Sequence, residues 1–236
     1  TSDNIKLHGW MLLQENPKDH ATVVVFHGID GNLGNNKLLF IENLYRRSNV
    51  NVLAMAYRGY SYSEGSPSEA GIKEDVKAII GYIFERKDID RDRIIIHGKS
   101  FGGGTAIYGI TACEDKPIKG IIIENTFTSL RDVILQKFAY LKLLFKLILT
   151  EIWPSINRIQ NIKVPILMFA SLGDKLIPPV HTAQLFEKAT AAPYKEIVEI
   201  PDGTHNETWS LDKEKYFGKV NEFIERCCSK KMMEIQ

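Results

Sequence analysis

Cysteine is scarce in this 236-residue sequence, which holds only Cys113, Cys227 and Cys228. Two of them are adjacent, so they cannot form a disulfide framework and we expect free thiols. An excess of charge is also missing, because the formal net charge at pH 7 is +1. A balanced charge gives no electrostatic reason to expect a nucleic acid as partner. No cluster of histidine, cysteine and glutamate has the spacing of metal ligands, so we expect neither a metal nor another cofactor.

Long hydrophobic runs are absent as well. The most apolar stretch, "FAYLKLLFKLIL" at residues 138–149, is interrupted by Lys142 and Lys146 and is too short to span a bilayer. No internal repeat, low-complexity segment or Pro/Gly-rich linker divides the chain. With 44% hydrophobic and 25% charged residues, the composition predicts one packed domain over residues 1–236.

Apolar segments of strand length alternate with segments of helical periodicity. This alternation predicts an α/β fold in which a mostly parallel central sheet is covered by helices on both faces. Ligands of such sheets bind at the carboxyl ends of the strands. Strands are expected at residues 21–26, 50–56, 93–96, 118–123, 164–170 and 196–200, and helices at 37–47, around 76–83, at 100–113, at 181–189 and along the C-terminal segment from 217 to 227.

The stretch "HGKSFGGG" at residues 97–104 can belong to two kinds of site. A phosphate-binding P-loop requires G-x-x-x-x-G-K-[ST], but Arg93 stands where its first glycine belongs. The alternative is the nucleophile elbow G-x-S-x-G, which raises Ser100 on a sharp turn between a strand and a helix. Gly98 and Gly102 leave room for that turn. The sequence therefore favours Ser100 as a nucleophile over a nucleotide site.

A serine nucleophile needs a base that is held by an acid, and behind such an elbow the chain order is serine, acid, histidine. Two histidines follow Ser100. We expect His181 to be a surface residue on a helix. His205 lies in "PDGTHNETW", a turn-rich loop between a strand and the last helix. Since the base of this fold occupies such a loop, we predict His205 as the base.

Three carboxylates compete for the role of the acid. Asp174 stands in the loop after a predicted strand, at "SLGDKLIPP", which is the usual place of the acid. Glu124 ends the preceding strand, and we expect it to anchor loop structure. Asp202 precedes a glycine and is expected to form a turn. We therefore predict Asp174 as the acid.

The negative charge that develops on an attacked carbonyl oxygen must be held by preorganised donors. We predict the backbone N–H groups of Phe101, directly after the nucleophile, and of Ile29, in the loop after the first strand, with Asp30 as the next choice for the second. His27 and His97 are expected to be structural rather than catalytic.

Several segments together resemble successive blocks of the alpha/beta hydrolase superfamily, and are most similar to its bud emergence protein 46-like subgroup. The resemblance implies the alpha/beta hydrolase fold and supports Ser100, Asp174 and His205 as nucleophile, acid and base. Members of the subgroup often carry an N-terminal membrane anchor, and we expect this chain, which begins at Thr1, to lack it; the protein is then membrane-associated or cytoplasmic. The segments are "FHGIDGN", "YRGYSYSEGSPSEAG", "GKSFGG", "IENTFTS", "DKLIPP" and "PDGTHNETW", between residues 26 and 209.

The sequence departs from the pattern of that subgroup at three places. The loop after "FHG" usually reads Asn-Ala and here reads Ile29-Asp30, whose carboxylate would disfavour an oxyanion if it pointed inward. Phe101 replaces a more usual leucine, and we expect it to narrow the entrance for an acyl group. The aspartate that usually precedes "YRG" is Ala56. These changes bear on substrate range rather than on catalysis.

Residues 128–163 break the alternation of strands and helices and are expected to form a short helical lid over Ser100. One alternative is that the apolar side of this lid packs on the domain. The other is an acyl tunnel or a membrane-surface contact, with Leu144, Phe145 and Ile148 binding substrate.

We therefore expect a serine hydrolase that cleaves an ester or thioester with an apolar acyl chain. A lipase or lysophospholipase and a protein depalmitoylase are the two main versions, with a lipid ester or an acylated protein as partner. A serine peptidase-like hydrolase, and a hydrolase-fold binding module without turnover, are the alternatives.

Overall fold

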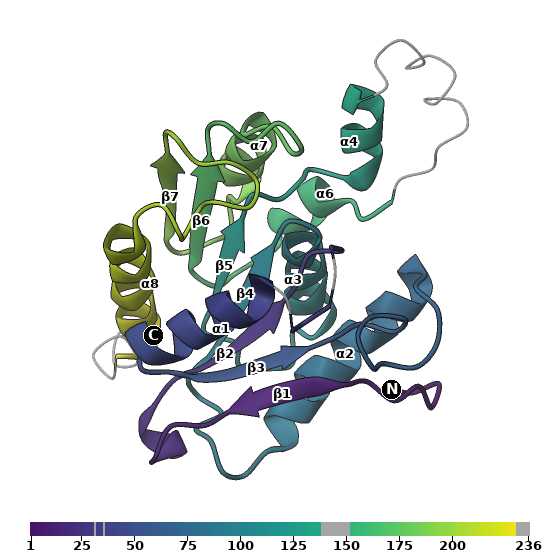
Figure 1. The fold of residues 1–236 in the computed structure, drawn as a ribbon, viewed down its shortest axis with the longest axis vertical. Coiled ribbons are helices and arrows are strands. Elements are labelled where there is room, and N and C mark those ends of the chain that lie inside the picture. Colours follow the sequence, from purple (N-terminus) through teal and green to yellow (C-terminus); the bar gives the residue numbers. More distant parts are fainter. Residues whose placement is uncertain (31, 35, 138–151, 230–236) are drawn as a thin grey trace.

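A seven-stranded sheet forms the centre of the molecule, and helices cover both of its faces (Figure 1). The structure, a computed structural model, describes residues 1–30, 32–34, 36–137 and 152–229. The strand order is β1-β3-β2-β4-β5-β6-β7, and among these strands β1 alone runs antiparallel to its neighbour. The strands are β1 (Gly9–Leu12), β2 (Thr22–Phe26), β3 (Asn51–Met55), β4 (Ile94–Lys99), β5 (Gly120–Glu124), β6 (Ile166–Ser171) and β7 (Lys195–Ile200).

Two hydrophobic cores lie on opposite faces of the sheet. Successive residues of a strand point to opposite faces, so Ile122 of β5 joins one core while Ile121 and Ile123 join the other. Helices α1 (Asn36–Arg47) and α8 (Lys213–Cys228) close the first core. The second core is closed by α2 (Glu69–Glu85), α3 (Phe101–Ala112), α6 (Ser155–Ile159) and α7 (Val180–Lys188).

The predicted mostly parallel sheet with helices on both faces is confirmed. Two details differ from the predicted elements. Strand β1 is not predicted, because its four residues are all half-buried at the sheet edge and show no alternation. Strand β4 extends beyond Ile96 to Lys99, because it lies between β2 and β5 and pairs with both as far as the start of the elbow.

The expected lid region begins with helix α4 (Leu130–Lys137) and ends with α6. Residues 138–151 between them, including Leu144, Phe145 and Ile148, lie outside the described residues. Trp153, just before α6, is buried and packs edge-to-face on Phe101 and Tyr108. This end of the insert is therefore part of the core over α3. Among the described residues, no helix has the length and hydropathy needed to cross a membrane.

The turn from β4 into α3 depends on two close backbone approaches. A Cβ atom on Gly98 would lie 2.2 Å from the carbonyl oxygen of Gly102. A Cβ atom on Gly102 would lie 1.9 Å from the carbonyl oxygen of Phe26 in β2. Both distances are far inside van der Waals contact, so α3 reaches its position against the sheet only if glycine occupies these two places.

We expect Gly102→Ala to lower the free energy of unfolding by about 3 kcal/mol, because the new methyl group meets backbone rather than a flexible side chain. Gly81→Ala and Gly218→Ala are matched controls in helix interiors, where a Cβ meets nothing within 4 Å. Each should raise the free energy of unfolding by about 0.5–1 kcal/mol. Urea unfolding of the three variants measures these changes in the free energy of unfolding. A Gly102→Ala variant as stable as the parent would contradict the close approach.

Candidate active site

Ser100 occupies a strained turn at the carboxyl end of β4. Its backbone angles are φ 55° and ψ −121°, a region that residues with a side chain rarely adopt. The turn is held by its neighbour β5. The Ser100 N–H donates to the Glu124 carbonyl at 2.8 Å, and the Thr126 hydroxyl donates to the Ser100 carbonyl at 2.7 Å. These bonds hold the Ser100 side chain above the edge of the sheet.

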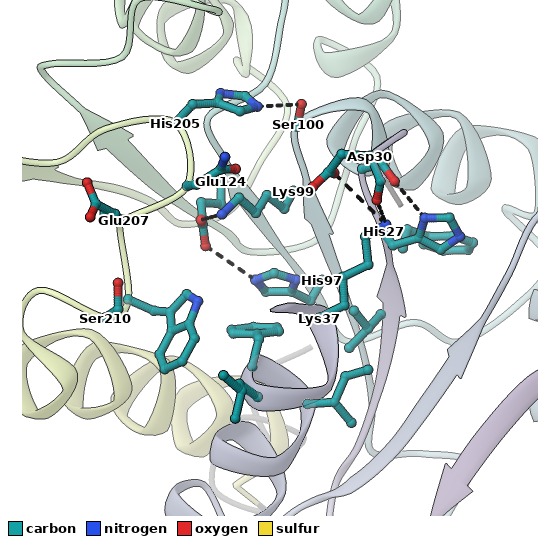
Figure 2. A pocket seen from close by; sticks show the side chains of 18 of the residues that line it. His27, Asp30, Lys37, His97, Lys99, Ser100, Glu124, His205, Glu207 and Ser210 are labelled. Atoms are coloured by element: carbon teal, nitrogen blue, oxygen red, sulfur yellow. Dashed lines mark hydrogen bonds and ion pairs between the residues drawn. The ribbon is translucent and has the colours of Figure 1, made fainter. Parts of the chain in front are cut away.

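The structure brings Ser100, His205 and Asp174 together in one hydrogen-bonded chain. His205 Nε2 lies 2.9 Å from Ser100 Oγ, and its Nδ1 lies 2.6 Å from Asp174 Oδ2. Figure 2 shows the His205 ring directed at the Ser100 hydroxyl. With the Nδ1 proton donated to the carboxylate, the Nε2 lone pair can accept the proton of the serine hydroxyl. The arrangement can therefore activate a serine.

Asp174 is placed by the backbone of its own loop after β6. Its other oxygen, Oδ1, accepts the N–H groups of Leu176 and Ile177 at 2.8 and 2.9 Å. The residue is only 4% exposed. Because Oδ1 is held by the loop, Oδ2 is left for the imidazole of His205.

Asn125 is a residue of this site that the sequence analysis does not single out. It follows β5 directly and is buried, with a positive φ of 46°. Its side-chain amide donates to Thr208 Oγ1 at 2.9 Å and lies 3.4 Å from the carbonyl of His205, while its Oδ1 accepts the Ser171 N–H at 2.9 Å. Asn125 thus connects the loop of the candidate base to strand β6. Its signals in the sequence are its place directly after a strand and its membership in the block "IENTFTS".

The two predicted oxyanion donors, the backbone N–H groups of Phe101 and Ile29, lie in segments next to Ser100. Phe101 is the first residue of α3, and the first N–H of a helix has no intrahelical acceptor. The loop after β2 that carries Ile29 passes close to the nucleophile, because a Cβ on Gly28 would lie 3.6 Å from Ser100 Cβ. Both predicted donors therefore belong to segments that adjoin Ser100.

The structure tests two expectations about side chains near the candidate oxyanion site, those of Phe101 and Asp30. The expectation that the Phe101 ring narrows the entrance is wrong. The ring is buried and packs edge-to-face on Tyr57 and Trp153, because α3 turns this side of the residue into the core. The Asp30 carboxylate is 74% exposed and lies 3.9 Å from the Lys37 ammonium, which also contacts the Asp30 carbonyl. Water therefore screens its charge.

The expectation that His181 is a surface residue is also wrong. The side chain is 3% exposed, because α4 covers the first turn of α7. Its Nδ1 lies 2.9 Å from Thr128 Oγ1 and its Nε2 lies 2.8 Å from Gln136 Oε1. Burial lowers the pKa of this imidazole. His181 thus connects α7 to the start of the insert. It is not part of the hydrogen-bonded chain of Ser100, His205 and Asp174.

His27 and His97 are buried, as expected for structural residues. Burial lowers the pKa of each to about 4, so both rings are neutral at pH 7. His97 Nε2 lies 3.1 Å from the Tyr216 hydroxyl, which donates to Glu124 Oε2 at 2.8 Å. Burial raises the pKa of Glu124, but the Lys99 ammonium, 3.1 Å from Oε1, and His97 bring it below its ordinary value. Glu124 thus stays ionised beneath the elbow.

A cavity of about 700 Å³ opens at Ser100 and His205 and extends between the sheet and the α1 and α8 layer. This volume is in the range of small-molecule sites. Its lining combines the buried polar residues His27, His97 and Glu124 with apolar side chains. Among the described residues, no group of His, Cys, Asp and Glu is arranged to hold a metal ion. The apolar lining is formed by Val25, Phe26, Leu33, Leu39, Phe40, Ile41 and Trp209.

Comparisons with known proteins extend over most of the chain. Residues 69–231 match the prolyl oligopeptidase family. Protein bem46 of Schizosaccharomyces pombe is 36% identical, over 95% of this chain and 74% of that protein. The alpha/beta hydrolase domain-containing protein WAV2 of Arabidopsis thaliana is 31% identical, over 99% and 79%. YNL320W of Saccharomyces cerevisiae, named an uncharacterized membrane protein, is 34% identical, over 95% and 77%.

Solved structures resemble the fold over almost its whole length. The esterase Pf2001 of Pyrococcus furiosus superposes with a TM-score of 0.78 at 24% identity, covering 97% of this chain and 90% of that one. Est1E from Butyrivibrio proteoclasticus superposes with a TM-score of 0.76 at 16% identity, covering 98% of both chains. These similarities confirm the predicted fold.

We expect the buried neutral His97 to make stability depend on pH. Its pKa in the folded chain, about 4, is below that of the unfolded chain, so its contribution is complete above about pH 6.5 and is lost as the pH falls toward 4. Between pH 7 and pH 5 this loss is about 2 kcal/mol. Urea unfolding measures this: between pH 7 and pH 5, the free energy of unfolding of His97→Gln should fall by about 2 kcal/mol less than that of the parent.

Ile95→Val is the matched control for this experiment, because Ile95 is a buried residue on the same side of β4 and carries no titratable group. It should lower the free energy of unfolding equally at pH 7 and pH 5. A His97→Gln variant that keeps the full pH dependence of the parent would contradict the assignment.

Proposed function

The chain belongs to the Bem46-like group of alpha/beta hydrolases, and we propose that it is a serine hydrolase that cleaves an ester or thioester with an apolar acyl chain. The observation that carries this proposal is the hydrogen-bonded chain Ser100–His205–Asp174 at the mouth of a cavity. It has the order and the contacts of a catalytic triad.

In the proposed reaction, Ser100 Oγ attacks the carbonyl carbon of the substrate while His205 Nε2 takes the hydroxyl proton. Asp174 holds the imidazole and stabilises the imidazolium. The N–H groups of Phe101 and Ile29 donate to the oxyanion of the tetrahedral intermediate. The imidazolium then protonates the leaving alcohol or thiol, which departs and leaves an acyl-enzyme. A water molecule, activated by His205, hydrolyses the acyl-enzyme and restores Ser100.

We propose an apolar acyl chain because the cavity next to Ser100 is lined by apolar side chains, among them Phe40, Ile41 and Trp209. A lysophospholipid or monoacylglycerol lipase and a depalmitoylase of acylated proteins are the two versions of this activity. The name of the S. cerevisiae relative supports action at a membrane surface. The structural relative Pf2001, which is named an esterase, supports ester cleavage.

A serine peptidase is the second candidate, because the family matched by residues 69–231 is that of prolyl oligopeptidases. A peptidase would use the same triad on an amide. Hydrolysis of proline-containing peptide anilides, with no hydrolysis of esters or thioesters, would replace the ester proposal by this one.

We expect a fluorescent fluorophosphonate to label the folded protein at Ser100, because the reagent reacts with activated serines. Labelling should vanish in Ser100→Ala and after heat denaturation. Asp174→Asn should lower kcat for a 4-nitrophenyl ester by about a thousandfold or more, because the imidazole loses the carboxylate that orients it. Gel fluorescence and ester hydrolysis measure the two effects.

Asp202→Asn is the matched control, because this aspartate is exposed and lies only three residues before His205. It is not part of the hydrogen-bonded chain of Ser100, His205 and Asp174. Its labelling and kcat should equal those of the parent. A folded protein that is not labelled, with or without detergent, would refute the serine hydrolase and favour a binding module.

We expect kcat/KM for 4-nitrophenyl esters to rise with acyl length from acetate to octanoate, because each further methylene buried in the cavity contributes about 0.8 kcal/mol. Phe40→Ala should reduce this rise by removing apolar lining. An acetate that is hydrolysed as efficiently as the octanoate would contradict an apolar acyl pocket. Parallel acyl thioesters of the same lengths decide between ester and thioester preference.

A further inference from the structure

Two lysine side chains line the same cavity as Ser100 and are largely withdrawn from solvent. Lys99 immediately precedes Ser100 at the end of β4, and its side chain is 24% exposed. Lys37 lies in the first turn of α1, and its side chain is 15% exposed. In Figure 2, Lys99 runs from the elbow toward Glu124, and Lys37 extends from α1 toward Asp30. Both ammonium groups therefore border the space in which a substrate of Ser100 would lie.

Among the described residues, the ammonium group of Lys99 has one close oxygen partner. Its Nζ lies 3.1 Å from Glu124 Oε1, and the second oxygen of that carboxylate accepts from Tyr216. A lysine ammonium group carries three protons for donation. One carboxylate oxygen therefore leaves donor capacity on the side of Lys99 that faces the cavity.

Lys37 has a weaker counter-ion. Its Nζ contacts the carbonyl oxygen of Asp30 and lies 3.9 Å from the Asp30 carboxylate, which is 74% exposed. An exposed carboxylate at this distance is screened by water and contributes little. Burial lowers the pKa of Lys37, because its ammonium group has lost hydration and the charge of Asp30 replaces that hydration only in part. A second anion beside it would restore that compensation.

The start of α1 adds to the positive potential of this side of the cavity. The helix has 12 residues, and its first turn contains no acidic residue. The N-terminus of a helix carries a partial positive charge and N–H groups without intrahelical acceptors. Lys37 lies in that first turn, and the cavity lining continues along the helix through Leu39, Phe40 and Ile41.

The net charge of the residues that line the cavity therefore differs between its interior and its rim. Inside, the two lysines face one buried carboxylate, Glu124. The other acidic residues of the lining, Asp30 and Glu207, are exposed at the rim, as is Lys213. The interior has an excess of one positive charge, close to the reacting serine.

We propose that the substrate of this hydrolase carries a carboxylate or phosphate group, which Lys37 and Lys99 bind. The inference rests on the proposed ester hydrolysis and specifies its substrate class, an amphiphilic ester with an apolar chain and an anionic group. The apolar lining receives the chain, and the two lysines select against neutral esters of the same length.

The test compares matched pairs of esters that differ by one anionic group. For a phosphate in the alcohol part, the pair is 1-oleoylglycerol 3-phosphate and 1-oleoylglycerol. For a carboxylate in the acyl part, the pair is 4-nitrophenyl hydrogen adipate and 4-nitrophenyl heptanoate. The parent should prefer the anionic member of at least one pair, and the pair that shows the preference identifies the source of the anion.

Lys37→Met should reduce kcat/KM for the preferred anionic ester by about tenfold and leave its neutral partner within about twofold, because a hydrogen bond to a charged group is lost. Lys37→Arg should retain the preference. The double variant Lys99→Met with Glu124→Gln removes the second ammonium group without leaving an unpaired buried carboxylate, and should also lower the preference. Lys188→Met, an exposed lysine at the end of α7, is the control and should behave as the parent.

Equal losses for both members of each pair in Lys37→Met and in the double variant would overturn the proposal, because a structural defect affects neutral and anionic esters alike. A parent without preference for either anionic ester would also overturn it.

Binding to Ser100→Ala separates this proposal from the proposed hydrolysis. Calorimetric titration with the same pairs needs no turnover. Tighter binding of an anionic member to Ser100→Ala, lost by about tenfold when Lys37→Met is added, supports the anion site even if no ester is hydrolysed. Equal binding of anionic and neutral members overturns it even if hydrolysis is established.

Discussion

The sharp turn at Ser100 is the constraint on which the other parts of the site depend. It requires α3 to begin within contact of both β4 and β2, and Gly98 and Gly102 provide that approach. The strained backbone of Ser100 is stabilised by hydrogen bonds from β5 and from Thr126. The same geometry leaves the first N–H of α3 without a helical acceptor beside the serine. One packing arrangement therefore positions both a candidate nucleophile and a candidate oxyanion donor.

The parallel sheet gathers the remaining polar groups at the same edge. Asp174 follows β6 and His205 follows β7, so their loops meet above the carboxyl ends of neighbouring strands. Asn125, after β5, braces the His205 loop against β6. Beneath this edge, Glu124 and Lys99 place opposite charges next to the buried polar groups of His97 and Tyr216. The buried Glu124 carboxylate stays ionised there because it pairs with Lys99, and the cavity gives both side chains access to a substrate.

Much of the fold follows from local patterns in the chain. Six strands and the helices between them are recognised from apolar runs and helical periodicity, because both depend on neighbours within a few residues. Strand β1 and the burial of His181 are missed, since one depends on pairing with β3 and the other on the covering by α4. The Phe101 ring is misjudged for a similar reason, because its partner Trp153 lies at the far end of the insert.

From the amino-acid sequence one can predict six of the strands, the elbow around Ser100, and Asp174 and His205 as its partners. These follow from short motifs and from the loop that each residue occupies. Three features appear only in the folded chain: Asn125 braces the loop of His205, His97, Tyr216 and Glu124 form one buried network, and Lys37 and Lys99 share a cavity with Ser100. His97 and Tyr216 are 119 positions apart in the chain. Contacts over such separations leave no local pattern, because they form only when α1 and α8 pack on the sheet.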